Sequence, residues 1–508
     1  MKTIIRNKLT NSKRRIQRRL DKADLRGCSK PILTASNIHY ELGGRSRGLG
    51  VGGIGAVHLL ARRLGFIDAI DQHLELLKMP RPYHESDHVL TLAYLPLCGG
   101  DRLEDLELLR NDEVFLDALG ARRIPDPTTA GDFCRRFNAA SIQILQDVID
   151  ATRIRAWAGQ PAAFFEQAIV DMDGTLVGTT GQCKRGMDIA YDGTWGYHPL
   201  VVTLANTGEV MGVLNRSGNR PSHEGAAAYA DRAMAVCFGG GFRRVLLRGD
   251  TDFSQTEHLD RWDDDPRVGF LFGFDATPNL KGIAEHLPAG AWQPLQRPPR
   301  YEVKTQPRQR PDNIKETIVV ARNFDNQRLQ SEEVAEFIYR PTACTRDYRM
   351  VVVRKNISVE KGEKHLFDTI VYFFYITNDC VSAANELVFT ANDRCDQENV
   401  LAQLHGLRAL HAPVDNLESN WAYMVMTALA WNLKAWWALT LPERPGRWQA
   451  KHQADKRWVL RLEFKTFVNA FIRLPCQIIR TGRKLVYRLL SWNVQQPIFF
   501  RLLDVLRC

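Results

Sequence analysis

The stretch AIVDMDGTLVG places Asp171 and Asp173 two positions apart at the end of an apolar run. Side chains at positions i and i+2 of a strand point to the same face, so both carboxylates are expected on one face of a sheet. Such oxygens suit a divalent cation or a phosphoryl-transfer site. Periodicity does not separate the two residues, but Asp173 is flanked by apolar residues on both sides and is our choice for the first acid.

Two later stretches supply the further acids that such a site needs. In LLRGDTDF an apolar run ends at Asp250, with Asp252 in the following loop, and NDRCDQENV carries Glu398 on an expected helix. Two-metal phosphodiester chemistry needs carboxylates that converge from separate elements. We therefore predict Asp173, Asp250 and Glu398 as catalytic and metal-binding residues, with Asp171 and Asp252 as alternative ligands. Taken singly, a carboxylate at a strand end is more often a turn or cap residue, and the assignment depends on the three acids occurring together in this order.

The pattern Asp-x-Asp-Gly-Thr also resembles the opening motif of haloacid-dehalogenase-type phosphatases. In that alternative Asp171 would attack phosphate and Asp173 would act as the acid. Such an enzyme leaves this strand through a loop and a helix. Here the strand runs on through Leu176 and Val177 into an alternating pattern typical of an antiparallel meander, which favours a nuclease-like core.

The elements around these acids follow a definite order. The segments MDIAYDGTWGY and PLVVTLANTGEVMGV predict a strand or turn and then two strands around an Asn-Thr-Gly turn. HEGAAAYADRAMAVCF predicts a helix, and FRRVLLRGD predicts a strand that stops at Asp250. The order strand, strand, strand, helix, strand is typical of the first half of a ribonuclease-H-like core.

The expected fold class is therefore α/β, a ribonuclease-H-like core interrupted by a β-rich insertion, with a helical N-terminal domain and a helical, basic C-terminal region. In the insertion we predict strands in YEVKTQP, ETIVVARNF, VAEFIYR, YRMVVVRK and TIVYFFYITN, which are rich in β-branched and aromatic residues. The predicted divisions are 1–54 (basic arm and Gly-rich linker), 55–160 (helical DNA-binding or dimerisation region), 161–274 (core, first part), 275–388 (insertion), 389–440 (core, second part with the Glu helix) and 441–508 (basic C-terminal region).

The positive charge lies mainly at the two ends of the chain. Residues 1–27 carry ten Lys/Arg against two Asp, and residues 441–508 carry fourteen Lys/Arg against four Asp/Glu, while the whole chain sums to +10. The middle is therefore acidic. Two basic ends favour a polyanion partner such as nucleic acid over a merely solvated tail. In the N-terminal arm the candidate DNA-contacting residues are Arg14, Arg15, Arg18 and Arg19.

The motifs together resemble the DDE transposases of bacterial insertion sequences, and most closely the group named after insertion sequence 1380 within the insertion-sequence-4-like superfamily. The resemblance covers about residues 50–440 and rests on DGT with downstream GYHPL, on LLRGDTDF and on DRCDQENVLAQL. In that superfamily the catalytic Glu lies in the spacing Tyr-x2-Arg-x3-Glu-x6-Lys. Arg394 and Glu398 match it, whereas Ala391 and His405 stand at the Tyr and Lys positions.

The resemblance implies metal-dependent cut-and-paste transposition, with cleavage at terminal inverted repeats and strand transfer to target DNA. It implies Mg²⁺, replaceable by Mn²⁺, with two ions per site, and a homodimer on double-stranded DNA. The non-enzymatic alternative is a transposase-derived DNA-binding protein with a dead site. We expect a bacterial cytoplasmic, nucleoid-associated protein without a membrane partner, because the apolar runs are too short to span a bilayer and the ten cysteines form no C-x-x-C pair.

Side chains around the expected Glu helix suggest how DNA is held. Arg394, Glu398 and His405 share one helix face, where Arg394 and His405 are candidate DNA contacts. A guanidinium binds a phosphate in bidentate fashion, and the plain alternative is a surface ion pair with Glu398. The tryptophans at 421, 431, 436, 437 and 448 are predicted to be core, whereas Trp292 is the candidate for contact with an unstacked base.

Overall fold

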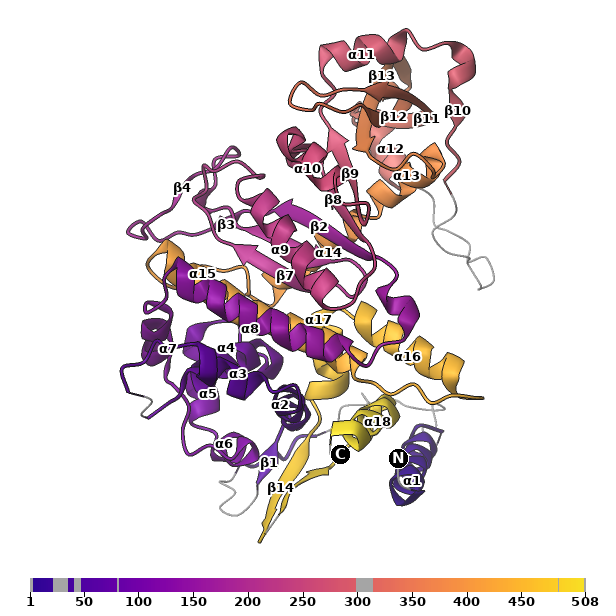
Figure 1. Ribbon diagram of the computed structural model, residues 1–508. Helices are drawn as coiled ribbons and strands as arrows, with labels where there is room; N and C mark the ends of the chain where they lie inside the picture. The colour runs from indigo at the N-terminus through magenta and orange to yellow at the C-terminus, as the bar shows by residue number, and fades with distance from the viewer. Residues whose placement is uncertain are drawn as a thin grey trace.

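The structure is a computed structural model that describes residues 3–21, 35–40, 47–79, 82–297, 314–482 and 484–506. A nine-stranded mixed sheet runs through the molecule in the order β10-β11-β12-β13-β9-β8-β2-β6-β7. In the view of Figure 1 the strands β10–β13 form the upper lobe of the molecule, and a helix-rich part lies below the strands β2, β6, β7 and β8. None of the helices in the described ranges is long and apolar enough to cross a lipid bilayer.

The half of the sheet that carries the predicted acids has the expected order of elements. Strands β2 (Ala168–Gly174), β8 (Val245–Gly249) and β9 (Val268–Phe274) are parallel neighbours, and β6 (Leu200–Leu204) and β7 (Glu209–Leu214) form an antiparallel hairpin beside β2. These short apolar runs suit strands covered by other layers. Helix α9 (Ala226–Gly239) lies across β2, β6, β7 and β8. The predicted succession of strands and helix is therefore confirmed, with the small β3-β5-β4 sheet (Val177–Gly178, Trp195–Tyr197, Asp188–Ile189) between β2 and β6.

The predicted β-rich insertion continues this same sheet. Its strands are β10 (Gln293–Pro294), β11 (Asp325–Tyr339), β12 (Tyr348–Lys361) and β13 (Lys364–Thr377), and β13 pairs with β9. Helices α10 (Leu259–Asp263), α11 (Pro278–Glu285), α12 (Ile314–Ala321) and α13 (Ala384–Asn392) accompany them. The predicted strand in ETIVVARNF is wrong, because its first part lies in α12. A residue's preference for strands depends on packing against neighbouring strands. The adjacent strand β11 is already paired on both sides, with β10 and β12, so the ETIVVARNF stretch gains no strand partner there. YEVKTQP lies outside the described residues.

The N-terminal region is helical as predicted. After α1 (Thr3–Asp21) come α2 (Ile54–Arg63), α3 (Phe66–His73), α4 (Glu85–Cys98), α5 (Leu106–Arg110), α6 (Glu113–Leu119), α7 (Pro127–Cys134) and α8 (Ala139–Trp157). The predicted Gly-rich linker is packed where it is described. Strand β1 (Gly48–Leu49) pairs with β14, and a Cβ on Gly53 would meet the Phe471 carbonyl oxygen at 1.9 Å.

Helix α15 (Leu417–Leu439) forms the centre of the helix-rich part, and 21 of its 23 residues are buried. It packs against α4, α7, α8, α16 and β7. The tryptophans at 421, 431, 436 and 437 are all buried, which confirms their prediction as core. Trp448 lies outside the helix and is 43% exposed, so for this residue the core prediction is wrong.

A buried carboxylate joins the sheet to the helices. Glu209 at the start of β7 is fully buried and accepts hydrogen bonds from Arg153 Nε (3.1 Å), Trp157 Nε1 (2.9 Å), Trp436 Nε1 (2.8 Å) and Thr207 Oγ1 (2.6 Å). A carboxylate this deep is tolerated only when it is paired and hydrogen-bonded. The contacts connect β7 with α8 and α15, so they fix the sheet relative to both helices.

The C-terminal region is only partly helical, in contrast to the prediction. It contains α16 (Gln449–Arg461), α17 (Phe464–Phe467) and α18 (Gln496–Leu506), but also a hairpin of β14 (Cys476–Thr481) and β15 (Lys484–Leu489). The hairpin pairs with β1 from the N-terminal region. Helix α1 lies beside this region, next to α18 (Figure 1). Accordingly, Arg6 of α1 and Arg501 of α18 line the same surface pocket.

Candidate functional site

Asp173, Asp250 and Glu398 come from three separate elements that meet at one edge of the sheet. Asp173 lies near the end of β2, Asp250 directly follows β8, and Glu398 lies in the first turn of α14 (Cys395–Gly406). Because β2 and β8 are parallel neighbours, their carboxyl ends reach the same edge. The topology therefore brings together residues that are far apart in the sequence.

Helix α14 is held against the sheet by hydrogen bonds near both of its ends. The Gln397 amide, whose residue is 2% exposed, donates to the carbonyl oxygens of Asp171 (3.2 Å) and Val201 (3.0 Å). At the other end of α14, His405 Nε2 lies 3.0 Å from Thr175 Oγ1. These contacts with β2, the residue after it and β6 set the position of the helix that carries Glu398.

The three carboxylates surround the guanidinium of Arg394. Arg394 Nη1 lies 3.1 Å from Asp173 Oδ2, and Nη2 lies 3.8 Å from Asp250 Oδ2 and 4.0 Å from Glu398 Oε1. The side chains of Arg394 and Asp173 are each 16% exposed, whereas that of Glu398 is 62% exposed. The simple surface pair of Arg394 with Glu398 is thus only one part of a partly buried cluster.

Burial shapes the electrostatics of this cluster. It raises the pKa of Asp173 to about 6, the nearby charge of Asp250 adds to the rise, and Arg394 opposes it. Burial likewise raises the pKa of Asp250. Burial disfavours the charged guanidinium, but Asp173, Asp250 and Glu398 together keep the pKa of Arg394 above its ordinary value. The cluster therefore has more negative charge than one arginine can neutralise, which is the environment of a cation site.

Asp171 has a different environment although it shares a strand with Asp173. It is 1% exposed, and both of its carboxylate oxygens accept hydrogen bonds from Arg248, at 2.7 and 2.8 Å. Asp171 and Arg248 are register partners on β2 and β8, and Arg248 also donates to the Thr390 carbonyl oxygen at 2.6 Å. This closed pair argues against Asp171 as a metal ligand and against the phosphatase alternative, whose nucleophile must be free.

The remaining predicted site residues are distributed around the molecule. Asp252 is exposed in the 3-10 turn η3 (Thr251–Phe253), and its backbone N–H donates to Asp250 Oδ1 at 3.0 Å, so it orients Asp250 through the main chain. Trp292 is 8% exposed with the Arg354 guanidinium 4.2 Å from its ring centroid, so base stacking on that face requires Arg354 to move. Arg14, Arg15, Arg18 and Arg19 line a surface pocket on α1.

The donor set fits a hard divalent cation, although the carboxylates are grouped around a guanidinium. Within the ranges that the structure describes, no three His, Cys, Asp or Glu side chains are spaced to hold one ion together. Mg²⁺ is usually held by one or two carboxylates together with waters and substrate phosphates.

Three residues that support the acids were not predicted from the sequence: Arg248, Gln397 and Thr175. Arg248 had a usable signal, because a lone arginine within an apolar strand requires a buried partner. Gln397 and Thr175 act through backbone and ring contacts that depend on how α14 docks on the sheet. Their spacing alone gave no sign of these roles.

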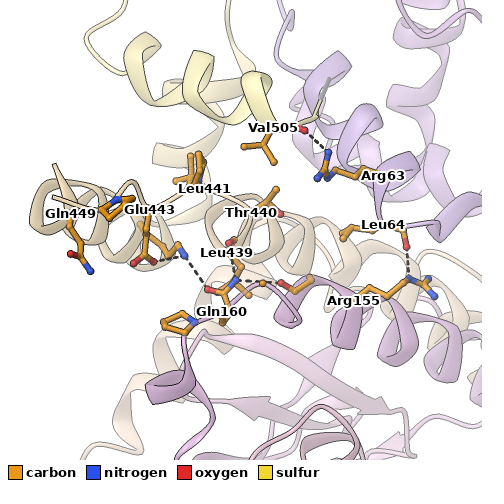
Figure 2. Close-up of a pocket in the computed structure, with 16 residues that line it drawn as sticks. Arg63, Leu64, Arg155, Gln160, Leu439, Thr440, Leu441, Glu443, Gln449 and Val505 are labelled. Carbon is orange, nitrogen blue, oxygen red and sulfur yellow. Dashed lines mark hydrogen bonds and ion pairs between the residues drawn. The ribbon is translucent and has the colours of Figure 1, made fainter. Parts of the chain in front are cut away.

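A cavity of about 570 Å³ lies elsewhere, between the ends of α2 and α15 and the helices α8, α16 and α18 (Figure 2). Its cationic side chains already have partners. Arg63 donates to the Val505 carbonyl oxygen, and Lys456 Nζ lies 2.6 Å from Glu443 Oε1. None of the residues of the acid cluster lines this cavity.

Comparison with known proteins identifies the family. The model of the transposase DDE domain, group 1, matches residues 34–508, so the chain belongs to this family of DDE transposases. Members act on DNA and generally use divalent metal ions. A comparison with curated protein sequences gives no match. Among solved structures, the chain is similar to piggyBac transposase in a synaptic complex with hairpin DNA, with 9% identity over 83% of this chain and 81% of that chain. The TM-score of 0.37 is too low for that likeness to support an argument.

The two aspartates on β2 are expected to respond oppositely to neutralisation. Asp171→Asn should lower the free energy of unfolding by about 3–5 kcal/mol, because it leaves Arg248 buried without a counter-charge. Asp173→Asn should be neutral or stabilising at pH 7 in chelator. Between the ordinary pKa of 3.8 and the folded value of about 6, the folded protein binds more protons at Asp173 than the unfolded chain does, so wild-type stability falls as pH rises through this window.

Denaturant unfolding of wild type and both variants between pH 4 and 7 measures these effects. The decline of stability with pH should be shallower in Asp173→Asn than in wild type. Equal losses of stability for the two variants at pH 7 would contradict the distinction between a closed structural pair and an open site.

Proposed function

We propose that this DDE transposase catalyses cut-and-paste transposition, by metal-dependent cleavage at the ends of an insertion sequence followed by strand transfer to target DNA. The observation that carries the proposal is the convergence of Asp173, Asp250 and Glu398 around Arg394 at one sheet edge. The resemblance of the motifs around these acids to those of the insertion sequence 1380 group supports the same proposed function.

The sheet topology supports a ribonuclease-H-like catalytic core. The order β7-β6-β2-β8-β9 has an antiparallel hairpin on one side of the first strand and two parallel strands on the other. The first acid lies on β2, the second follows β8, and the third lies on a helix after the insertion. We infer that the insertion lengthens the core sheet without separating the acids in space.

The proposed site uses Mg²⁺, with Mn²⁺ as a substitute, held by Asp173, Asp250 and Glu398. When bound, two such ions supply activation of the attacking oxygen and stabilisation of the leaving oxygen. The chain supplies the positions of the three carboxylates through β2, β8 and α14. Arg394 and His405 are proposed to hold phosphates of the DNA end beside them, although His405 is already close to Thr175.

The partner of the protein is DNA, and two basic segments are proposed to bind it. Arg6 of α1 lines a pocket with Arg444, Lys451 and Arg501 of the C-terminal region. Among the described residues that line this pocket, the one carboxylate is that of Asp455, which pairs with Arg501 at 2.8 Å. Two like-charged segments at close range favour a polyanion between them, because it neutralises both and releases counterions. We propose that a homodimer holds two terminal inverted repeats in this way, on DNA in the bacterial cytoplasm.

A DNA-binding protein with an inert site is the second candidate. It is favoured by the single guanidinium that contacts all three carboxylates. It predicts binding of DNA ends without metal-dependent cutting.

Neutralising each acid in turn separates these two candidates. Asp173→Asn, Asp250→Asn and Glu398→Gln should each lower the rate of strand cleavage in Mg²⁺ by at least about a thousandfold, because each removes a metal ligand. Binding of the DNA end should change by less than about threefold, since the phosphate-contacting cations remain. The measurement is cleavage of a labelled end in a gel assay, with binding followed by fluorescence anisotropy.

Glu386→Gln, an exposed acid in the first turn of α13, provides a control that should cut normally. Normal cutting by Asp250→Asn would overturn the site assignment. Absence of cutting by the wild type on a verified end would favour the inert DNA-binding protein.

The basic face of α1 is expected to determine part of the salt dependence of DNA binding. Changing Arg14, Arg15, Arg18 and Arg19 to Gln should reduce the slope of log affinity against log salt by up to about 3–4, because up to four phosphate contacts are lost. The slope is measured by anisotropy between low and physiological salt.

Four other arginines provide a control of equal charge: Arg243, Arg267, Arg340 and Arg346 are about half exposed and paired with acids. Their change to Gln should leave the slope nearly unchanged. An unchanged slope in the α1 variant would show that this helix does not contact DNA.

A further inference from the structure

The two arginines at the sheet edge are held in different ways. Arg248 is 3% exposed and forms two hydrogen bonds of 2.7 and 2.8 Å with the single carboxylate of Asp171. Arg394 is 16% exposed, and only its contact with Asp173, at 3.1 Å, lies within hydrogen-bond range. Its distances to Asp250 and Glu398 are 3.8 and 4.0 Å. One arginine is therefore locked in place, while the other contributes charge to several carboxylates without a fixed pairing.

The position of Arg394 coincides with the place where the proposed cations must bind. Asp250 and Glu398 both face the same nitrogen, Nη2, and Asp173 faces Nη1. A guanidinium and a divalent ion in the same gap would repel each other strongly, because both are cations within a few ångströms in a partly buried site. The two cannot share these carboxylates in the present arrangement.

We propose that the Arg394 guanidinium is an exchangeable counter-ion that occupies the carboxylate cluster in the absence of metal and leaves it when divalent ions bind. Arg394 is thus a positioning residue: it keeps three like-charged side chains together before the ions arrive. The withdrawn guanidinium is then free for a DNA phosphate, which offers the planar, bidentate acceptor that arginine prefers. This inference rests on the proposed function in so far as the same three acids are the metal ligands.

The proposal makes metal affinity, rather than catalysis, the informative quantity. Removing the guanidinium removes a competitor and leaves the carboxylates more strongly in need of a cation. Arg394→Gln should therefore bind Mn²⁺ about tenfold more tightly than the wild type, the size expected when a hydrogen bond between charged groups no longer has to be broken. Isothermal titration of the full-length protein with Mn²⁺, without DNA, measures this affinity.

Two matched variants make the measurement specific. Arg267→Gln removes the same charge from an exposed pair with Asp265 and should change Mn²⁺ affinity by less than about twofold. Arg394→Lys keeps the charge but loses the planar group, so its affinity for Mn²⁺ should lie between those of the wild type and Arg394→Gln. It also keeps the test available if the glutamine variant does not fold.

Thermal unfolding in chelator and in Mn²⁺ gives a second, independent signal. Arg394→Gln should melt at a lower temperature than the wild type in chelator, because the carboxylates then repel one another without a counter-charge. Mn²⁺ should raise its melting temperature more than it raises that of the wild type.

Mn²⁺ affinity of Arg394→Gln equal to or weaker than that of the wild type would overturn the proposal, and so would a weaker affinity in Arg394→Lys. Failure of the proposed function is recognised separately. If Asp250→Asn loses Mn²⁺ binding but the wild type does not cut DNA, the proposed transposase function is contradicted and the counter-ion proposal is not. If Asp250→Asn binds Mn²⁺ as the wild type does, both the proposed function and the counter-ion proposal are contradicted.

Discussion

Carboxylates that lie close together in a partly buried space repel one another, and a fold can hold them there only if cations or bound protons neutralise them. Asp173, Asp250 and Glu398 are in this situation, and Arg394 is the cation that the chain itself supplies. Its one positive charge does not balance three carboxylates. Burial and the charge of Asp250 therefore raise the pKa of Asp173 although Arg394 opposes the rise. The cluster keeps an excess of negative charge, which a bound divalent cation would neutralise. Arg394 would then be available to bind a DNA phosphate.

The rest of the architecture keeps these groups in place. Parallel pairing of β2 with β8 brings two acids to one edge, and the Asp171–Arg248 pair ties the same two strands together below them. Gln397 fixes the helix of the third acid to main-chain oxygens of β2 and β6. Farther away, Glu209 joins the sheet to α8 and α15 through hydrogen bonds among buried side chains.

Periodicity and turn chemistry predicted much of this arrangement. The strand order around β2, the N-terminal helices, the insertion and the choice of acids to compare all came from local patterns, because each depends on near neighbours in the sequence. Features that depend on distant partners were not predictable. Asp171 and Asp173 point to the same face of one strand, so the alternation of residues cannot distinguish them. Their arginine partners do: Arg248 forms a closed, buried pair with Asp171, whereas Arg394 leaves Asp173 in a partly exposed cluster. The packed Gly-rich segment and the β14–β15 hairpin likewise depend on contacts between the two ends of the chain.

The most direct test of the account is a crystal structure of the protein with a DNA end and Mn²⁺, in which anomalous scattering locates the ions. The account predicts anomalous peaks within coordination distance of carboxylate oxygens of Asp173, Asp250 and Glu398, with the Arg394 guanidinium moved onto a phosphate. Manganese bound elsewhere at saturating concentration, with Arg394 still between the three carboxylates, would contradict it.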